Sequence, residues 1–237
     1  MIGKAVRRAF LAAGLLAVLA VAGCGGGGGG ETKLSAAAIA EQTAEKTGAV
    51  KSFHFSFNIE NAPAGRPGLN LTFADGDLIV PDKLRARVAG TLSGLSLRSE
   101  LVFFEDQHYL KDPLTGTWRK LDAETSPVAF FDPAKGVLSV IKSAMELEKA
   151  GSGRVGGVDT YRLKGVVRAR AITPILGNAP SDKVVDLELW VGKDDLIVRR
   201  IRLSGPVAEG EPDNIVRTVE VSQFGKSFKI EPPATAT

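Results

Sequence analysis

The chain has 237 residues, of which 44% are hydrophobic and 24% are charged, and its single cysteine is Cys24. Lysine and arginine total 30 against 27 aspartates and glutamates, so the formal net charge is only +3. One cysteine excludes a framework of disulfides within the chain, and so small a charge excess argues against the basic patch on which nucleic-acid binding normally rests.

Residues 1–23 are predicted to be a secretory signal peptide. Lys4, Arg7 and Arg8 form a basic start, residues 9–22 are an apolar run, and small residues close it. The run is shorter than the ~20 residues that cross a bilayer core as a helix. Because the predicted signal holds these basic residues and no acid, the rest of the chain has no formal net charge. We therefore expect no nucleic-acid partner.

The end of this segment predicts a lipid anchor. Residues 21–24, Val-Ala-Gly-Cys, resemble the bacterial lipobox, in which the cysteine receives a diacylglyceryl group and the signal is cut just before it. Cys24 would then be the acylated N-terminus, which leaves the folded domain without a thiolate for a metal site. Residues 24–32 consist of this cysteine and a glycine-rich segment, which is predicted to act as a flexible tether. The alternatives are an uncleaved anchor with an incidental cysteine and a signal peptide cut elsewhere.

The next part of the chain is predicted to be a helix followed by an antiparallel meander. Residues 33–47 have helix-forming composition, and Gly48 is a typical helix stop. From Ser52 the apolar period changes to two, which is typical of a strand with one buried face. Further strands are predicted at residues 69–73, 84–90, 95–104, 107–112 and 117–123, with a tight turn at Glu105–Asp106 between the fourth and fifth of the meander.

The rest of the chain repeats this plan. Residues 137–145 have helical apolar spacing, residues 169–180 read as a short helix or loop, and residues 183–205 form the clearest hairpin. Strands are also predicted at residues 160–167 and 214–225. Nine or ten mostly antiparallel strands with separate helices indicate an α+β fold, a large curved sheet packed on a few helices. The folded domain is assigned to residues 33–233, and residues 234–237 are a flexible tail.

No catalytic constellation is found, and we predict neither an enzyme nor a metal or cofactor site. His54 and His108 are interpreted as ordinary surface histidines, outside any zinc-binding spacing. Residues 151–156, GSGRVG, match the dinucleotide fingerprint literally, but a strand follows where a helix is needed, so they are interpreted as a hairpin loop. Glu146 and Glu148 are interpreted as solvated carboxylates.

Several segments resemble the LppX/LprAFG lipoproteins. They are the lipobox cysteine, the helix before SFHFSF at residues 52–57, ADGDLIVPDKLRARV at residues 74–88, WRKLD…FDPAKGVLSVI, GGVDTYRLKGVV and the closing VSQFGKSFKIEPP. The resemblance covers roughly residues 33–233, while the six glycines and the acidic loop at residues 207–214 have no counterpart in the family pattern. It implies a half-barrel sheet that encloses an apolar cavity for acylated lipids or glycolipids, which family members carry across the cell envelope.

The walls of this cavity are predicted from periodicity, because a period-two face and a period-3.6 stripe must meet around the ligand. The predicted wall residues are Phe53, Phe55, Phe57, Leu71 and Phe73 of the first strands and Val137, Val140 and Ile141 of the central helix. The first hypothesis is a carrier anchored at the outer face of the cell membrane, with a lipid or glycolipid ligand and a membrane transporter as a further partner. The alternatives are a structural or chaperone-like accessory lipoprotein with a solid core, and an exported hydrolase.

Overall fold

A computed structural model describes residues 33–63, 69–92, 94–122, 133–172 and 183–234. The chain divides into two compact units, Met1–Lys33 and Leu34–Thr237. The first unit lies almost wholly outside the described residues, and so do Cys24 and the glycine run. The helices and strands of the described structure belong to the second unit.

The described part of this unit consists of eleven strands, two α-helices and a short 3-10 helix. The helices are α1 (Ala36–Gly48), α2 (Pro133–Lys142) and η2 (Ala169–Ile172). The strands are β1 (Ser52–Glu60), β2 (Leu69–Ile79), β3 (Lys83–Leu92), β4 (Leu95–Phe104), β5 (Gln107–Lys111), β6 (Trp118–Leu121), β7 (Met145–Val155), β8 (Val158–Arg168), β9 (Val184–Gly192), β10 (Val198–Ser204) and β11 (Val216–Ser222).

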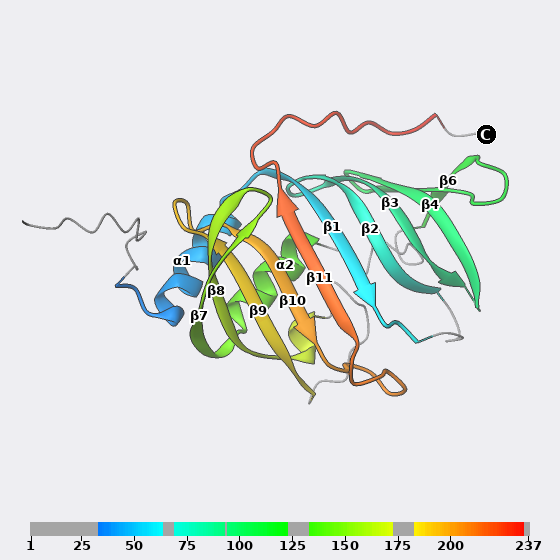
Figure 1. The fold of residues 1–237 in the computed structure, drawn as a ribbon. Coiled ribbons are helices and arrows are strands. Elements are labelled where there is room, and N and C mark those ends of the chain that lie inside the picture. Colours follow the sequence, from blue (N-terminus) through cyan, green and yellow to red (C-terminus); the bar gives the residue numbers. More distant parts are fainter. Residues whose placement is uncertain (1–32, 64–68, 93, 123–132, 173–182, 235–237) are drawn as a thin grey trace, which may run out of the picture. The chain divides into compact units, whose positions relative to one another are not determined.

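All eleven strands belong to one sheet, in the order β6-β5-β4-β3-β2-β1-β11-β10-β9-β8-β7 (Figure 1). Every pairing is antiparallel, and nearly all join strands that follow one another along the chain. Only β1 with β11 pairs the beginning of the domain with its end. The α+β prediction of a large curved antiparallel sheet with a few helices is thereby confirmed.

The prediction failed at β7. Residue 145 was expected to end a helix and residues 151–156 to form a hairpin loop, but Met145–Val155 is a strand and the turn lies at Gly156–Gly157. β7 is an edge strand whose register shifts between Met145 and Glu148 and again between Lys149 and Ser152. These irregularities break the period-two burial that identifies a strand from sequence.

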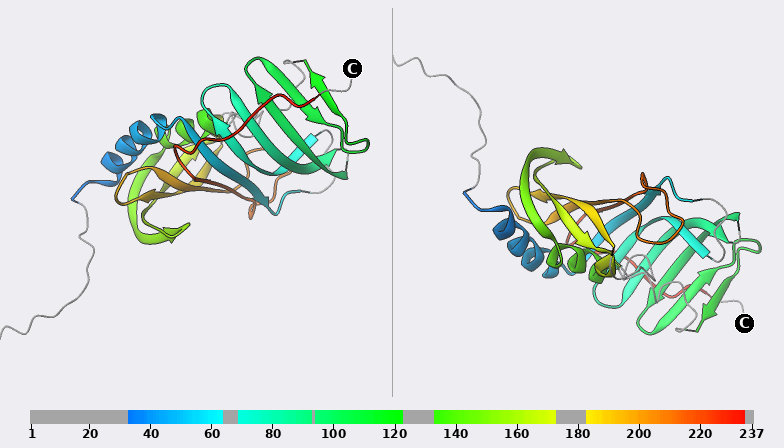
Figure 2. Two further views of the ribbon diagram at one scale, coloured as in Figure 1. Left: turned by 90° about the horizontal axis from the view of Figure 1, so that it is seen from above. Right: turned by 90° about the horizontal axis from the view of Figure 1, so that it is seen from below.

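The helices begin and end close to the predicted positions. Ser35 caps α1, since its side-chain oxygen accepts a hydrogen bond from the backbone N–H of Ala38 at 3.1 Å. α2 starts at Pro133, four residues earlier than predicted, because proline suits the first turn of a helix. Figure 2 shows α1 and α2 on the same side of the sheet, over β7–β11. No described helix lies over β2–β6 (Figures 1 and 2).

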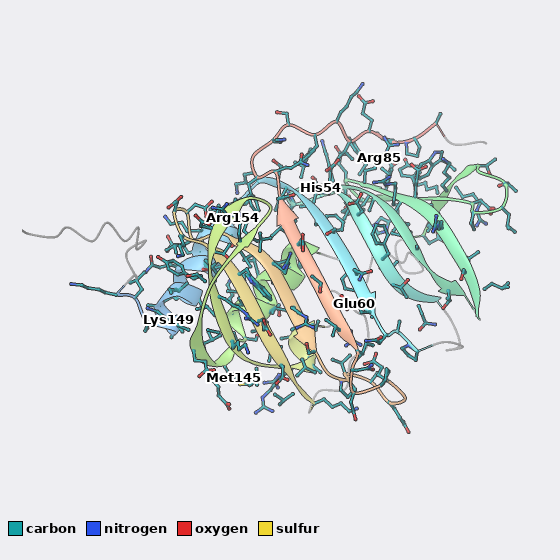
Figure 3. All side chains as sticks on the ribbon, in the orientation of Figure 1. His54, Glu60, Arg85, Met145, Lys149 and Arg154 are labelled. Atoms are coloured by element: carbon teal, nitrogen blue, oxygen red, sulfur yellow. The ribbon has the colours of Figure 1, made fainter. Side chains whose placement is uncertain are left out.

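The face of the sheet toward the helices, here called the inner face, holds the main hydrophobic core. This core extends from one half of the sheet to the other through cross-strand pairs of apolar residues. One such row consists of Leu163, Leu189, Ile201, Val219, Phe57 and Ala74. The outer face carries ion pairs between neighbouring strands, including Arg200–Glu220, Arg87–Asp75 and Lys111–Glu100. Figure 3 shows the side chains on both faces. This division explains the period-two pattern of the sequence.

A second, smaller cluster lies on the outer face near the end of the chain. The segment after β11 runs past the ends of β1–β4 (Figure 1), and the backbone N–H of Gly225 donates to the carbonyl oxygen of Ser52 at 2.9 Å. Ile230 packs there against Val102 and Tyr109, which point away from the main core. The C-terminal segment thereby covers apolar side chains of β4 and β5.

Candidate functional site

The inner face differs between the two halves of the sheet. In the β7–β11 half its side chains are large and buried: Leu163, Leu189 and Val191 are fully inaccessible to solvent. In the β2–β6 half small residues occupy the middle of the face, since Phe55 pairs with Gly76, and Gly76 pairs with Ala86. Farther along this half, Phe103 and Leu110 are only half-buried. Space for an apolar ligand is therefore more readily made in the β2–β6 half.

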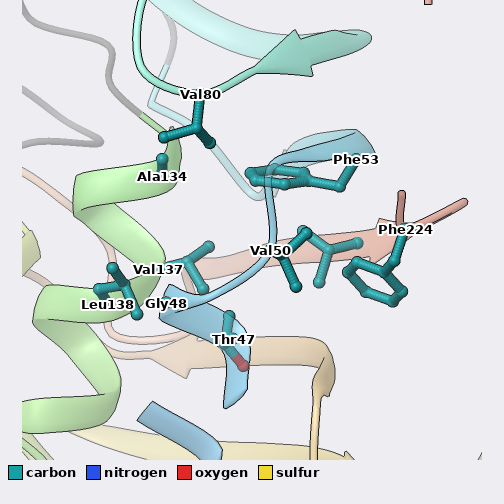
Figure 4. A pocket seen from close by; sticks show the side chains of 10 residues that line it. Thr47, Gly48, Val50, Phe53, Val80, Ala134, Val137, Leu138 and Phe224 are labelled. Carbon is teal, nitrogen blue, oxygen red and sulfur yellow. The ribbon is translucent and has the colours of Figure 1, made fainter. Parts of the chain in front are cut away.

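A small pocket lies where the two helices meet the start of β1 and the end of β2. Its lining consists of Thr47, Gly48, Val50, Phe53, Val80, Ala134, Val137, Leu138, Val221 and Phe224 (Figure 4). All but Thr47 and Gly48 contribute apolar side chains. Its volume is about 40 Å³. Pockets for drug-sized ligands measure roughly 300–1,000 Å³, so this pocket is too small for a lipid chain. A cavity of lipid size is not formed at this position.

The predicted wall residues divide into three groups. Phe53 and Val137 line the pocket from opposite sides, as Figure 4 shows. Phe55, Phe57, Val140 and Ile141 belong to the main core, each at most 3% exposed, and Leu71 is partly buried against it. Phe73 does not join the others.

Phe73 lies on the outer face. It pairs with Asn58, whereas the next residue, Ala74, pairs with Phe57 on the inner face. The sequence predicted that Leu71 and Phe73 share a face, but the β2–β3 register shifts between these two residues. Such a bulge changes which side chains share a face, so the period-two argument fails across it.

His54 lies on the polar face of its strand, as the sequence indicated, whereas His108 is not the surface residue that was predicted. His54 is half-buried on the outer face, where its Nδ1 lies 2.8 Å from Asp77 and its Nε2 lies 3.2 Å from Asp75. His108 is only 8% exposed, on the inner face, with its ring edge-on to Phe103 at 4.5 Å between centroids. Its Nδ1 is buried and has no hydrogen-bond partner among the described residues. Burial lowers the pKa of His108, an effect that the nearby charge of Asp106 partly opposes.

A buried ion pair holds the acidic loop between β10 and β11. Arg217 on β11 lies 2.6 Å from Glu211 in the loop, and their side chains are 2% and 5% exposed. The other oxygen of Glu211 accepts from the backbone N–H of Val207 at 2.8 Å. Burial by itself raises the pKa of Glu211, but hydrogen bonds from Arg217 and Val207 outweigh it, so the net shift is downward. This loop is therefore fixed to the edge of the core by charge.

The remaining described features concern metal ligands, carboxylates and helix length. Among the residues with described positions, no group of three or more histidine, cysteine, aspartate or glutamate side chains is placed to hold a metal ion. Glu146 and Glu148 are exposed on the edge strand β7. None of the described helices is both long enough and apolar enough to cross a bilayer.

Comparison with known proteins identifies the family. The family model described as LppX_LprAFG lipoprotein matches residues 35–230. The chain belongs to the LppX/LprAFG lipoprotein family. The lipoarabinomannan carrier protein LprG of Mycobacterium tuberculosis is 27% identical over 192 residues, which cover 78% of this chain and 79% of that protein. The LprG of Mycolicibacterium smegmatis is 25% identical over 242 residues, covering 96% and 98% of the two chains.

Solved structures of two family members share the fold. LprF of Mycobacterium bovis matches with a TM-score of 0.66 and 16% identity, over 85% of this chain and 97% of that one. LppX of Mycobacterium tuberculosis matches with a TM-score of 0.58 and 17% identity, over 82% and 97% of the two chains. At this level of identity the comparison establishes the fold of this LppX/LprAFG protein and leaves its ligand to be inferred from the inner face.

Proposed function

We propose that this protein binds acylated lipids or glycolipids against the inner face of the β2–β6 half and carries them through the cell envelope. The observation that supports this most directly is the family match over residues 35–230, together with relatives named as carriers of lipoarabinomannan. The inner face supplies the apolar surface that such a ligand requires.

The physical requirement is an interior as apolar as a membrane. Each buried CH₂ group contributes ~0.8 kcal/mol, so a chain of about 16 carbons would lose roughly 12 kcal/mol on entering water alone. On the inner side of β3 and β4, Leu84 and Leu101 are buried and Phe103 is half-buried, so these apolar side chains would contact a ligand once space opens beside them. No acid or base is needed for transfer. Catalysis plays no part in this proposal.

Binding requires the pocket to widen. The pocket of about 40 Å³ lies between the N-terminal half of α2 and the β1–β2 end of the sheet. Movement of α2 away from Phe53 and Val80 would extend the pocket toward the inner side of β3 and β4. The wall residues Phe53, Phe55, Phe57, Leu71, Val137, Val140 and Ile141 would border the widened space, and Phe73 would not.

The carrier would act from a membrane anchor. Acylation of Cys24 after cleavage of residues 1–23 would hold the domain at the outer face of the cell membrane, with the glycine run as a tether. A membrane transporter that supplies the lipid is a further partner in this scheme. In a Cys24→Ala variant, intact-mass analysis should detect the uncleaved chain without a diacylglyceryl group. A wild-type chain whose mass lacks that group would contradict the anchor.

The function itself is tested by the lipid that accompanies the protein. The full chain is purified from bacterial membranes, its noncovalent lipids are extracted, and mass spectrometry gives the moles of lipid per mole of protein. Acyl groups on Cys24 stay with the polypeptide and do not confuse the count. We expect acylated lipid at a fixed ratio, reduced in a Phe103→Ser variant and unchanged in the outer-face variant Arg85→Ser. A wild-type extract without bound lipid would favour the accessory lipoprotein with a solid core.

A further inference from the structure

His108 is an unusual residue for its position. It lies on the inner face of β5, where its cross-strand neighbours are Phe103 and Leu121. The residue is 8% exposed, and its buried Nδ1 has no hydrogen-bond partner in the part of the chain that the structure describes. Buried polar atoms are nearly always paired, because an unpaired one forfeits its hydrogen bonds to water without compensation. An unpaired nitrogen at this position points to a partner that binds from outside the chain.

Ser99 and His54 differ from His108, because both have hydrogen-bond partners. Ser99, which shares the inner face on β4, donates to the carbonyl oxygen of Lys111 at 2.5 Å. His54 has a carboxylate at each ring nitrogen and lies on the outer face. His108 thus offers an unused hydrogen-bonding group on an otherwise apolar part of the inner face.

A continuous row of side chains links His108 to the pocket. Strand register pairs Phe53 with Leu78, Leu78 with Leu84, Leu84 with Phe103, and Phe103 with His108. Strands lie about 4.8 Å apart, so the row spans roughly 19 Å between β1 and β5. It begins at Phe53, which lines the pocket, and every member before His108 is apolar. The row therefore resembles an amphiphile in its distribution of polar groups, because it is apolar along its length and has one polar residue at its end.

We propose that His108 donates a hydrogen bond to an ester carbonyl oxygen of the bound lipid, whose acyl chain lies along this row toward the pocket. The inference rests on the proposed function and adds the chemistry of the ligand at a specific residue. The ester carbonyl is the polar group directly attached to an acyl chain, so it is the first oxygen that follows an apolar track. Burial lowers the pKa of His108 below its ordinary 6.5, so the imidazole is mostly neutral at pH 7. In a neutral imidazole one ring nitrogen carries a proton that can be donated, and the other is unprotonated.

The test compares two probes that differ only at the carbonyl. The full-length protein in detergent micelles is titrated with dipalmitoylglycerol and with its dihexadecyl ether analogue, which keeps the chains and the free hydroxyl. We expect the wild type to bind the ester more tightly by about two- to tenfold, the net effect of one hydrogen bond. His108→Phe should remove that preference and leave the affinity for the ether unchanged. The phenyl ring of this variant should keep the edge-on contact that the His108 ring makes with Phe103.

Two further measurements make the result decisive. His108→Gln restores an N–H donor and should recover part of the ester preference. In the wild type, the ¹⁵N chemical shifts of the His108 ring should change on addition of the ester and hardly at all on addition of the ether. This measurement does not depend on the folding of any variant. An ester preference that persists in His108→Phe, or equal weakening for both probes, would overturn the role of His108 alone. Failure of the wild type to bind either probe would overturn the proposed carrier function as well.

Discussion

The β7–β11 half and the β2–β6 half of the sheet are built on the same alternating pattern, yet they are packed differently. In the first half the inner side chains are mostly buried leucine, isoleucine and valine, and α1 and α2 lie against them. In the second half alanine and glycine alternate with larger residues, and no described helix covers the face. The first half is a filled core, while the second combines small apolar residues with the buried imidazole of His108.

This difference separates stability from binding within one continuous sheet. Strand pairing makes the two halves mechanically continuous through β1 and β11. A filled core resists changes of volume, whereas a face with small residues tolerates an inserted chain. The following predictions test this separation.

The largest expected effect concerns the ion pair at the rim of the β7–β11 half. Replacing Arg217 by Met leaves Glu211 buried without its partner, which should lower the free energy of unfolding by about 3–5 kcal/mol in denaturant titrations at pH 7. The exposed pair Arg154–Asp159 supplies the control, since water screens it and Arg154→Met should leave the free energy of unfolding nearly unchanged. Equal losses of unfolding free energy in the two variants would show that burial of the Arg217–Glu211 pair does not increase the cost of breaking it.

The same pair has a definite pH dependence. The pKa of Glu211 is lowered in the folded state from its ordinary 4.5, so its contribution to stability is complete above that pH. It is lost as the pH falls through the folded-state pKa, because the unfolded chain takes up the proton first. Wild-type stability should therefore decline more steeply below about pH 4.5 than that of Arg217→Met.

A pair of truncations compares the two halves directly. Leu189→Ala opens a cavity beside a fully buried residue of β9, and should cost about 2–5 kcal/mol without changing the affinity for lipid. Phe103→Ala, at a half-buried position of β4, should cost less stability and weaken lipid binding severalfold. Thermal melting with a lipid titration on the same samples gives both values. Reversed results would mean that the ligand lies in the β7–β11 half.

β2 and β3 approach each other closely at Gly76. A Cβ atom there would lie 2.2 Å from the carbonyl oxygen of Arg85 and 2.7 Å from Ala86, so the backbone of β3 would have to move. Gly76→Ala should therefore destabilise the protein by roughly 1–3 kcal/mol. At Gly153 the nearest contact is the side chain of Trp190 at 3.3 Å, so Gly153→Ala should have less effect. Equal melting temperatures for the two variants would argue against a close strand approach at Gly76.

The smallest effect is expected from the titration of His108. Its folded-state pKa lies below the ordinary 6.5, so the unfolded chain binds a proton that the folded chain resists. The contribution of His108 to the free energy of unfolding should be complete above about pH 6.5 and should decline as the pH falls from there through the folded-state pKa. His108→Phe should reduce this decline, as measured by denaturant titrations between about pH 7 and 5. An identical pH profile in the variant would place the titrating group elsewhere.

Much of the site was accessible from sequence, and the exceptions have physical causes. The alternation of Phe53, Phe55 and Phe57 placed three wall residues on the inner face, because successive side chains of a regular strand must alternate. Phe73 was misplaced because a bulge in β2 interrupts that alternation. His108 was taken for a surface residue because it lies close to the turn at Glu105–Asp106, where exposure is the usual expectation.

The sequence by itself determined the order of the strands other than β7, the approximate helix positions, the α+β class and the family, since these follow from local periodicity, caps and recognisable segments. Only the tertiary structure decided which half of the sheet the helices cover, how small the pocket is, and that His108 faces inward. Those features depend on register and on contacts between distant segments, such as β1 with β11 and α2 with Val80. A shift of one residue in pairing exchanges the two faces of a strand, and no local pattern specifies that choice.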